Sequence, residues 1–195
     1  MEVTSIINSV FTSVTYCLSE PGFGGIWLVD CGDVGKLDPS IPVAGVLLTH
    51  THFDHIYGIN ALLKRCPDVK VYTNSFGEKA LLNPRWNLSH YYAEIPDFVI
   101  DKPENIVVID ELSVLEILGH PVTIKPVPGH DESCLAYVIE GNLFTGDAFI
   151  PGQKVVTNLP RCNKDLARQS ESFLRQLAGQ YNLFPGHSSL PVSTL

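Results

Sequence analysis

The sequence predicts an α/β fold in which two β-layers pack together and helices cover them from outside. Strand-like and helical segments follow one another in the order β-run, helix, β-run, helix along the 195 residues. An apolar Val/Leu run at 43–48, a helical pattern after it and a short run at 69–73 form a βαβ unit, which implies parallel strands. No internal repeat or Ser/Gly linker interrupts this order, so we expect a single domain over residues 1–195.

The first half begins with a predicted β-hairpin. Residues 11–18 and 25–30 are rich in β-branched and aromatic residues, and a Pro-Gly-Phe-Gly-Gly turn separates them. After the βαβ unit, whose helix we expect to end near Lys64, a second helix is predicted at 76–82, because Asn83-Pro84 disfavours its continuation. Residues 85–102 lose all periodicity, and we favour a short helical insertion with a buried aromatic face over a binding loop.

The second half is predicted to be mostly β-structure. Turn signals such as Gly119-His120-Pro121 and Glu140-Gly141-Asn142 separate short apolar segments. The predicted strands are 106–109, 113–118, 122–127, 134–139, 143–145 and 181–184. One amphipathic helix, at about 164–177, places Leu166, Phe173, Leu174 and Leu177 on one side.

Composition and charge exclude several classes of function. The formal net charge of −8 disfavours binding to nucleic acid or to an anionic membrane, so we expect a small-molecule substrate. Apolar runs stay well below the roughly 18 residues that span a bilayer, and the N-terminus lacks the basic start of a secretory signal. Five scattered cysteines without a Cys-x-x-Cys pair favour neither disulfides nor a thiolate zinc site. We therefore expect a cytoplasmic monomer or homodimer.

The segment Thr49-His50-Thr51-His52-Phe53-Asp54-His55 holds four side chains that can bind metal within six residues. It lies where the predicted strand meets the helix. On extended backbone His50 and His52 would point to one side and could share an ion, while Asp54 and His55 would be turned towards a second. A structural role explains Asp54 alone, as a helix N-cap, but not three clustered histidines.

Four further sites place a ligand-type side chain at the end of an apolar strand. Three of them are glycine turns: Pro128-Gly129-His130-Asp131, Thr145-Gly146-Asp147 and Pro185-Gly186-His187. Asp30 ends the second strand of the hairpin. Glycine allows the sharp turn that presents the next side chain at a strand end. Each turn alone is a weak signal, but together with the cluster at 50–55 they indicate one shared site.

The order His-x-His-x-Asp-His at 50–55, then His130, Asp147 and His187, resembles the metallo-β-lactamase superfamily over about residues 25–187. This resemblance implies a four-layer αββα sandwich with the metal site at one edge of the two sheets. It also implies one metal held by His50, His52 and His130 and a second held by Asp54, His55 and His187, with Asp147 between them. Asp30 falls where that superfamily has a supporting aspartate that orients a ligand histidine or its loop.

The activity implied by the resemblance is that of a metal-dependent hydrolase. The turns at 128–130 and 144–147 are most similar to glyoxalase II, whose members hydrolyse glutathione thioesters, although this chain ends eight residues after His187, where glyoxalase II continues into a helical domain. Two divalent ions, zinc first and iron or manganese next, would share a bridging hydroxide that attacks a thioester, ester or lactone. Asp54 and Asp147 would be the catalytic carboxylates that orient it.

Three alternatives stay open at this point. A related persulfide dioxygenase would hold one iron through His50, His130 and Asp147. A nuclease or phosphodiesterase is opposed by the acidic charge, and a module with one structural zinc is opposed by ligands at open strand ends. For substrate contacts we expect His90, Tyr91 and Tyr92 near the entrance. Arg161, with Lys154 and Lys164, could receive an acidic tail.

Overall fold

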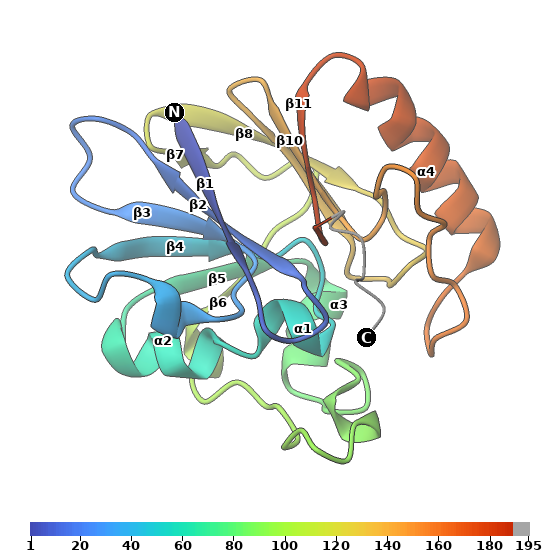
Figure 1. Ribbon diagram of the computed structural model, residues 1–195, viewed down its shortest axis with the longest axis horizontal. Helices are drawn as coiled ribbons and strands as arrows, with labels where there is room; N and C mark the ends of the chain where they lie inside the picture. The colour runs from blue at the N-terminus through green and yellow to red at the C-terminus, as the bar shows by residue number, and fades with distance from the viewer. Residues whose placement is uncertain (189–195) are drawn as a thin grey trace, which may run out of the picture.

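The computed structural model describes residues 1–188, whose strands form two sheets (Figure 1). The first sheet has the order β1-β2-β3-β4-β5-β6. Its strands are β1 (Glu2–Ile7), β2 (Val14–Ser19), β3 (Ile26–Val29), β4 (Val43–Leu47), β5 (Lys70–Thr73) and β6 (Ile106–Val108). Strand β2 pairs antiparallel with both β1 and β3, and the successive pairs from β3 to β6 are parallel. The predicted hairpin and βαβ unit are both confirmed.

The second sheet has the order β11-β10-β9-β8-β7. Its strands are β7 (Glu116–Ile117), β8 (His120–Pro126), β9 (Leu135–Ile139), β10 (Asn142–Gly146) and β11 (Asn182–Pro185). Only β10 and β11 pair in parallel, because helix α4 (Lys164–Ala178) forms the crossover between them. The carboxyl ends of these two strands therefore lie side by side.

Strand alternation sorts the apolar side chains into three clusters. On β4, Val46 packs in one cluster with the helices and Leu47 in another between the sheets. On β9, Tyr137 joins Leu47 between the sheets, and Ala136 packs with Leu174 of α4 in the third cluster. Because successive side chains of a strand face opposite sides, both sheets are covered on both faces. The result is the αββα sandwich.

The helices lie on the outer faces. Helices α1 (Phe53–Ile56), α2 (Ile59–Arg65) and α3 (Ser75–Leu81) are beside the first sheet, and α4 covers the second (Figure 1). Short 3₁₀ turns are η1 (Val34–Lys36), η2 (Ser89–Tyr91) and η3 (Pro103–Asn105). No helix within residues 1–188 combines the length and the apolar character needed to cross a membrane.

Several element boundaries differ from the sequence prediction. Strand β1 was not predicted, and β2 begins at Val14 rather than at Phe11, because Phe11 and Thr12 have φ angles of 52° and 57°. The strand expected at 113–118 shrinks to two residues, with Val114 fully exposed. On α4 the buried residues are Ala167, Ser170 and Leu174, while the expected core residues Leu166 and Phe173 are 38% and 39% exposed.

The favoured interpretation of residues 85–102 as a helical insertion is wrong. Apart from η2 the segment is irregular, and Tyr91 is 55% exposed although Phe98 is buried. The side chain of the buried Asn87 makes hydrogen bonds to backbone carbonyls on both sides of it in the sequence. Its Nδ2 donates to the carbonyls of Ala80 (2.9 Å) and Phe98 (3.0 Å). One buried amide side chain thus provides hydrogen bonds to backbone groups of a loop whose conformation shows no periodic pattern in the sequence.

A glycine separates α1 from α2 where the sequence predicts one helix. Gly58 N–H donates to the Cys31 carbonyl (2.9 Å), and a Cβ on Gly58 would lie 1.9 Å from the Gly32 carbonyl oxygen. We expect Gly58→Ala to lower the free energy of unfolding by about 1–3 kcal/mol, since the backbone must move to relieve this contact. Urea denaturation measures the change. Gly35→Ala, where a Cβ meets no atom within 4 Å, is the matched control, and an equal loss in both variants would contradict the argument.

Candidate metal centre

All predicted ligand residues follow the carboxyl ends of strands. In the first sheet, the segments that follow β3 and β4 carry Asp30 and residues 50–55. In the second sheet, the segments that follow β8, β10 and β11 carry His130, Asp147 and His187. His52 is the N-cap residue of α1, so Asp54 lies inside the first turn rather than at the cap. The structure brings the seven predicted ligands together at one edge of the sandwich.

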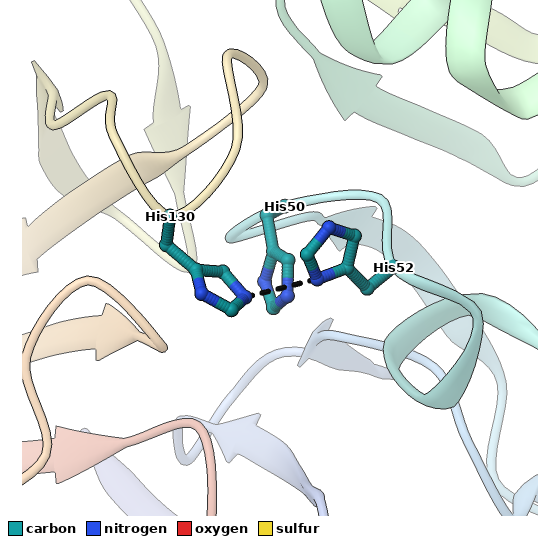
Figure 2. Close-up of side chains that lie close together, drawn as sticks. All are labelled: His50, His52 and His130. Carbon is teal, nitrogen blue, oxygen red and sulfur yellow. Dashed lines mark hydrogen bonds between the residues drawn. The ribbon is translucent and has the colours of Figure 1, made fainter. Parts of the chain in front are cut away.

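The first cluster consists of His50, His52 and His130 (Figure 2). All three are buried, and one ligand nitrogen from each lies within 4.8 Å of the others. His52 Nδ1 is 2.9 Å from His130 Nε2. His50 Nε2 is buried and has no hydrogen-bond partner among the described residues, which is uncommon for a buried polar atom. Three converging imidazoles form a donor set that suits zinc or another divalent transition metal.

The second cluster consists of Asp54, His55 and His187. Asp54 Oδ2 is 3.3 Å from both His55 Nε2 and His187 Nε2, and the two nitrogens are 3.4 Å apart. The rings of His50 and His55 have centroids 4.2 Å apart, so the two clusters adjoin. A nitrogen–oxygen donor set of this kind is again typical of zinc or iron.

Asp147 lies between the clusters. Its Oδ2 is 3.6 Å from His130 Nε2 and 3.2 Å from His187 Nε2, and its Oδ1 is 3.5 Å from His55 Nε2. Oδ1 is buried without a hydrogen-bond partner in residues 1–188. This placement fits the predicted role of a carboxylate shared by two ions.

Hydrogen bonds on the far side of three rings fix which nitrogen faces the centre. His130 Nδ1 donates to the Val156 carbonyl and His187 Nδ1 to the Phe11 carbonyl, both at 2.9 Å. His55 Nδ1 donates to Asp30 Oδ2 at 2.8 Å. Carbonyl oxygens only accept, so Nδ1 carries the hydrogen and a neutral ring turns its Nε2 lone pair towards the centre. The site is therefore oriented to bind cations.

Asp30 is buried and also holds the backbone that leads to the ligands. Its Oδ1 accepts Thr49 N–H at 2.8 Å, and its Oδ2 accepts the Thr49 hydroxyl at 2.7 Å. Asp30 has a φ of 61°, a left-handed conformation that aspartate tolerates better than most residues. The structure thus places Asp30 where the sequence predicts a supporting aspartate.

The electrostatics of the two clusters differ. Burial, reinforced by neighbouring histidines, lowers the pKa of His50 well below its usual value and that of His52 to about 4, which favours the neutral, metal-binding form. Burial opposes the charge of His187, yet hydrogen bonds to Asp147 and Asp54 raise its pKa to about 9. Burial would likewise raise the pKa of the Asp54 carboxyl, but the charge of His55 and hydrogen bonds to His187 and His55 hold it far below the usual range.

Most of the predicted substrate residues lie outside the cavity that adjoins the two clusters. A cavity of about 200 Å³ is lined by His130, Asp147, Ile150, Gln153, Lys154, Val155, Val156 and His187. His90 instead contacts the exposed Asp97 at 3.2 Å, and Tyr92 packs on Phe11 with ring centroids 5.2 Å apart. Arg161 is paired with Asp131 and Glu132. Lys154 alone of the predicted basic contacts lines this cavity.

Sequence reasoning missed the groups that fix the rings. The carbonyls of Phe11 and Val156 carry no side-chain signal, because any residue offers a carbonyl. Asp131 did carry one, as a carboxylate directly after a predicted ligand histidine, and the structure buries it beside His52.

Comparisons with known proteins show which family and which relatives this chain resembles. Residues 36–187 match the family model of the metallo-beta-lactamase superfamily. The whole chain is 27% identical to a protein of Streptococcus pyogenes serotype M6 named "Probable metallo-hydrolase", covering 86% of its length. It is 28% identical over 78% of its length to the hydroxyacylglutathione hydrolase of Shewanella oneidensis, but the match spans only 54% of that enzyme.

Solved structures show the same fold at low sequence identity. The B3 metallo-beta-lactamase BLEG-1 superposes with a TM-score of 0.82 at 21% identity, covering 96% of this chain and 92% of that one. TTHA1623, solved in a di-iron-bound form, gives 0.74 at 20% identity over 95% and 92% of the two chains. ETHE1 from Myxococcus xanthus gives 0.68 at 19% identity over 98% and 77%. On the family match, the fold and the ordered ligand segments together, the chain belongs to the metallo-beta-lactamase superfamily.

Proposed function

We propose that this protein is a metal-dependent hydrolase of a small thioester, ester or lactone, similar in activity to glyoxalase II. The observation that carries the proposal is the pair of adjoining clusters with Asp147 between them. Sequence similarity to a hydroxyacylglutathione hydrolase supports the thioester class, although the chain spans about half the length of such relatives. Five unpaired cysteines support the further proposal of a reducing, cytoplasmic location.

In this proposal His50, His52 and His130 hold one divalent ion, and Asp54, His55 and His187 hold another. Ions in these positions, zinc or alternatively iron or manganese, would lower the pKa of water towards neutrality and polarise a substrate carbonyl. Asp54 and Asp147 are held ionised, since nearby histidine charges keep the pKa of both carboxyls low despite burial. Their oxygens can accept hydrogen bonds from the attacking water and so orient it.

The two candidate nucleophiles that follow His130, Ser133 and Cys134, are poorly placed to attack a substrate. Cys134 is buried, and burial raises the pKa of its thiol well above the usual value. The Ser133 hydroxyl is committed to Asp131 and to the backbone of Thr51. Hydrolysis by water is therefore the reaction that the described residues favour.

Metal analysis combined with a substrate panel tests the proposal. Elemental analysis of the purified protein is expected to give up to two divalent ions per chain. Chelation should abolish turnover of lactoylglutathione, an aryl ester or a lactone, and added zinc should restore it. No hydrolysis of any panel member by metal-loaded protein would refute the proposal. A single iron with oxygen uptake on glutathione persulfide would indicate a dioxygenase instead, and phosphodiester cleavage a nuclease.

A basic groove next to the cavity predicts a preference for acidic substrates. The groove, about 330 Å³, shares Lys154 and Val155 with the cavity and also contains Lys164 and Arg168. We expect Lys154→Met to raise KM for an acidic-tailed thioester by about 2–5-fold, since exposed ion pairs contribute about 0.2–1 kcal/mol. KM for a neutral ester should not change. Lys79→Met, on α3 outside both cavities, is the control, and an unchanged KM for the acidic substrate would refute the preference.

A further inference from the structure

Asp131 is a fully buried carboxylate surrounded by hydrogen-bond donors. Its Oδ1 accepts Ser133 N–H at 2.8 Å and the Ser133 hydroxyl. Its Oδ2 accepts Arg161 Nε–H at 3.2 Å and lies 3.9 Å from His52 Nε2. Two segments that supply the three-histidine cluster therefore converge on one side chain.

His52 differs from the other histidines of the site. His55, His130 and His187 each have an acceptor within 2.9 Å on the ring nitrogen that faces away from the centre. His52 Nδ1 faces His130 Nε2, and its Nε2 is buried without a hydrogen-bond partner in residues 1–188. Asp131 Oδ2 is the acceptor placed to orient the Nε2–H of His52.

Arg161 holds the Asp131 carboxylate in place. Its guanidinium carbon stacks 4.1 Å from the ring centroid of Trp86, and its NH2 group pairs with Glu132 at 2.8 Å. The same loop braces His130, because the Val156 carbonyl accepts its Nδ1–H and Cys162 Sγ–H donates to its carbonyl at 2.9 Å. Planar stacking and a fixed fork of donors make arginine suited to this task and lysine a poor substitute.

The same carboxylate also acts on the backbone between His50 and His52. The Ser133 hydroxyl, which donates to Asp131, accepts Thr51 N–H at 3.1 Å. Moving the Asp131 side chain would therefore displace both the ring of His52 and the chain that carries it.

We infer that Asp131, held by Arg161 and Trp86, is a positioning residue that orients His52 for metal binding in the three-histidine cluster. The inference rests on the proposed function in that this cluster binds a metal. It assigns Arg161 to the metal site rather than to the substrate.

Asp131→Asn tests the inference with little change in shape. All four neighbours of the carboxylate are donors, so an amide NH2 must face at least one of them. Stepwise zinc titration should show one ion bound about 10–100-fold more weakly, the usual effect of losing an outer partner of a ligand histidine, and the other unchanged. In the zinc-loaded protein, where His52 Nδ1 would face the ion, ¹⁵N NMR should show a His52 Nε2–H signal, and this signal should shift in the variant.

Glu132→Gln is the matched control, because it removes the exposed partner of Arg161 and leaves Asp131 intact. It should bind both ions as the wild type does. If Asp131→Asn fails to fold, Arg161→Gln takes its place and should weaken the same ion by about 3–10-fold. Unchanged affinity for both ions and an unchanged His52 Nε2–H signal would overturn the inference while leaving the proposed function intact. A wild type that binds no metal would overturn the proposed function, and with it the inference that rests on it.

Discussion

Replacement of Asp147 by Asn is expected to lower kcat/KM by at least about 10³-fold, or about 4 kcal/mol of transition-state stabilisation. The amide keeps the shape of the side chain but removes the charge that faces His55, His130 and His187 within 3.6 Å. The loss should exceed the roughly 10–100-fold cost of substitutions outside the ligand shell, because Asp147 belongs to both clusters. Steady-state kinetics with the best substrate of the panel measures it.

Asp97→Asn provides the control for Asp147→Asn. It makes the same chemical change in an exposed aspartate–histidine pair, 3.2 Å from His90 and outside the described cavity. Activity should be unaffected. A decrease of less than tenfold for Asp147→Asn, with normal folding shown by circular dichroism, would contradict a central role for this carboxylate.

Replacement of Asp30 by Asn is expected to affect stability and metal binding together. An amide NH2 at the Oδ2 position would face the His55 Nδ1–H, which now donates there at 2.8 Å. His55 would then have to adopt the tautomer with the hydrogen on Nε2, the nitrogen that faces the site. We expect a loss of about 1–3 kcal/mol in unfolding free energy, from an unsatisfied buried group, and about 10–100-fold weaker binding of one ion.

The affected ion distinguishes Asp30→Asn from Asp131→Asn. Asp30 supports the cluster of Asp54, His55 and His187, whereas Asp131 supports the three histidines. Asp33→Asn, three residues along the chain and hydrogen-bonded to Ser9 and Tyr57 rather than to a ligand, controls for simple destabilisation. If Asp30→Asn loses stability but binds both ions normally, the assignment of Asp30 to His55 is wrong.

Most of the architecture could be predicted because burial on both faces leaves a clear sequence pattern. The βαβ unit around Val43–Leu47 and helix α4 were recognised by composition and period. Strand β1 was not, since it is an edge strand with most of its side chains exposed or half-exposed, so no apolar run marks it. The predicted face of α4 was half right, since Leu174 and Leu177 pack in the core but Leu166 and Phe173 do not. Packing against a sheet buries small residues such as Ala167, which the periodicity of large residues overlooks.

The candidate site divides in the same way. Residues whose type is itself the signal, such as His50 and Asp147, could be predicted from sequence, and the structure brings them together. The groups that support these residues could not be predicted. The Phe11 carbonyl acts through its position on the backbone. Arg161 was expected to bind an acidic substrate because of its charge, but Asp131 and Glu132 neutralise that charge. Long-range geometry decides such roles, and a linear pattern does not contain it.

Each cluster takes ligands from both sheets: His50 and His52 follow β4 while His130 follows β8, and Asp54 and His55 follow β4 while His187 follows β11. An ion in either cluster would therefore act as a cross-link between the two halves of the sandwich. Binding to the folded state alone adds stability of about 4 kcal/mol at a thousandfold excess over Kd. Metal binding would thus add to the apolar contacts that already join the two sheets, and loss of metal would lower the stability of the whole sandwich.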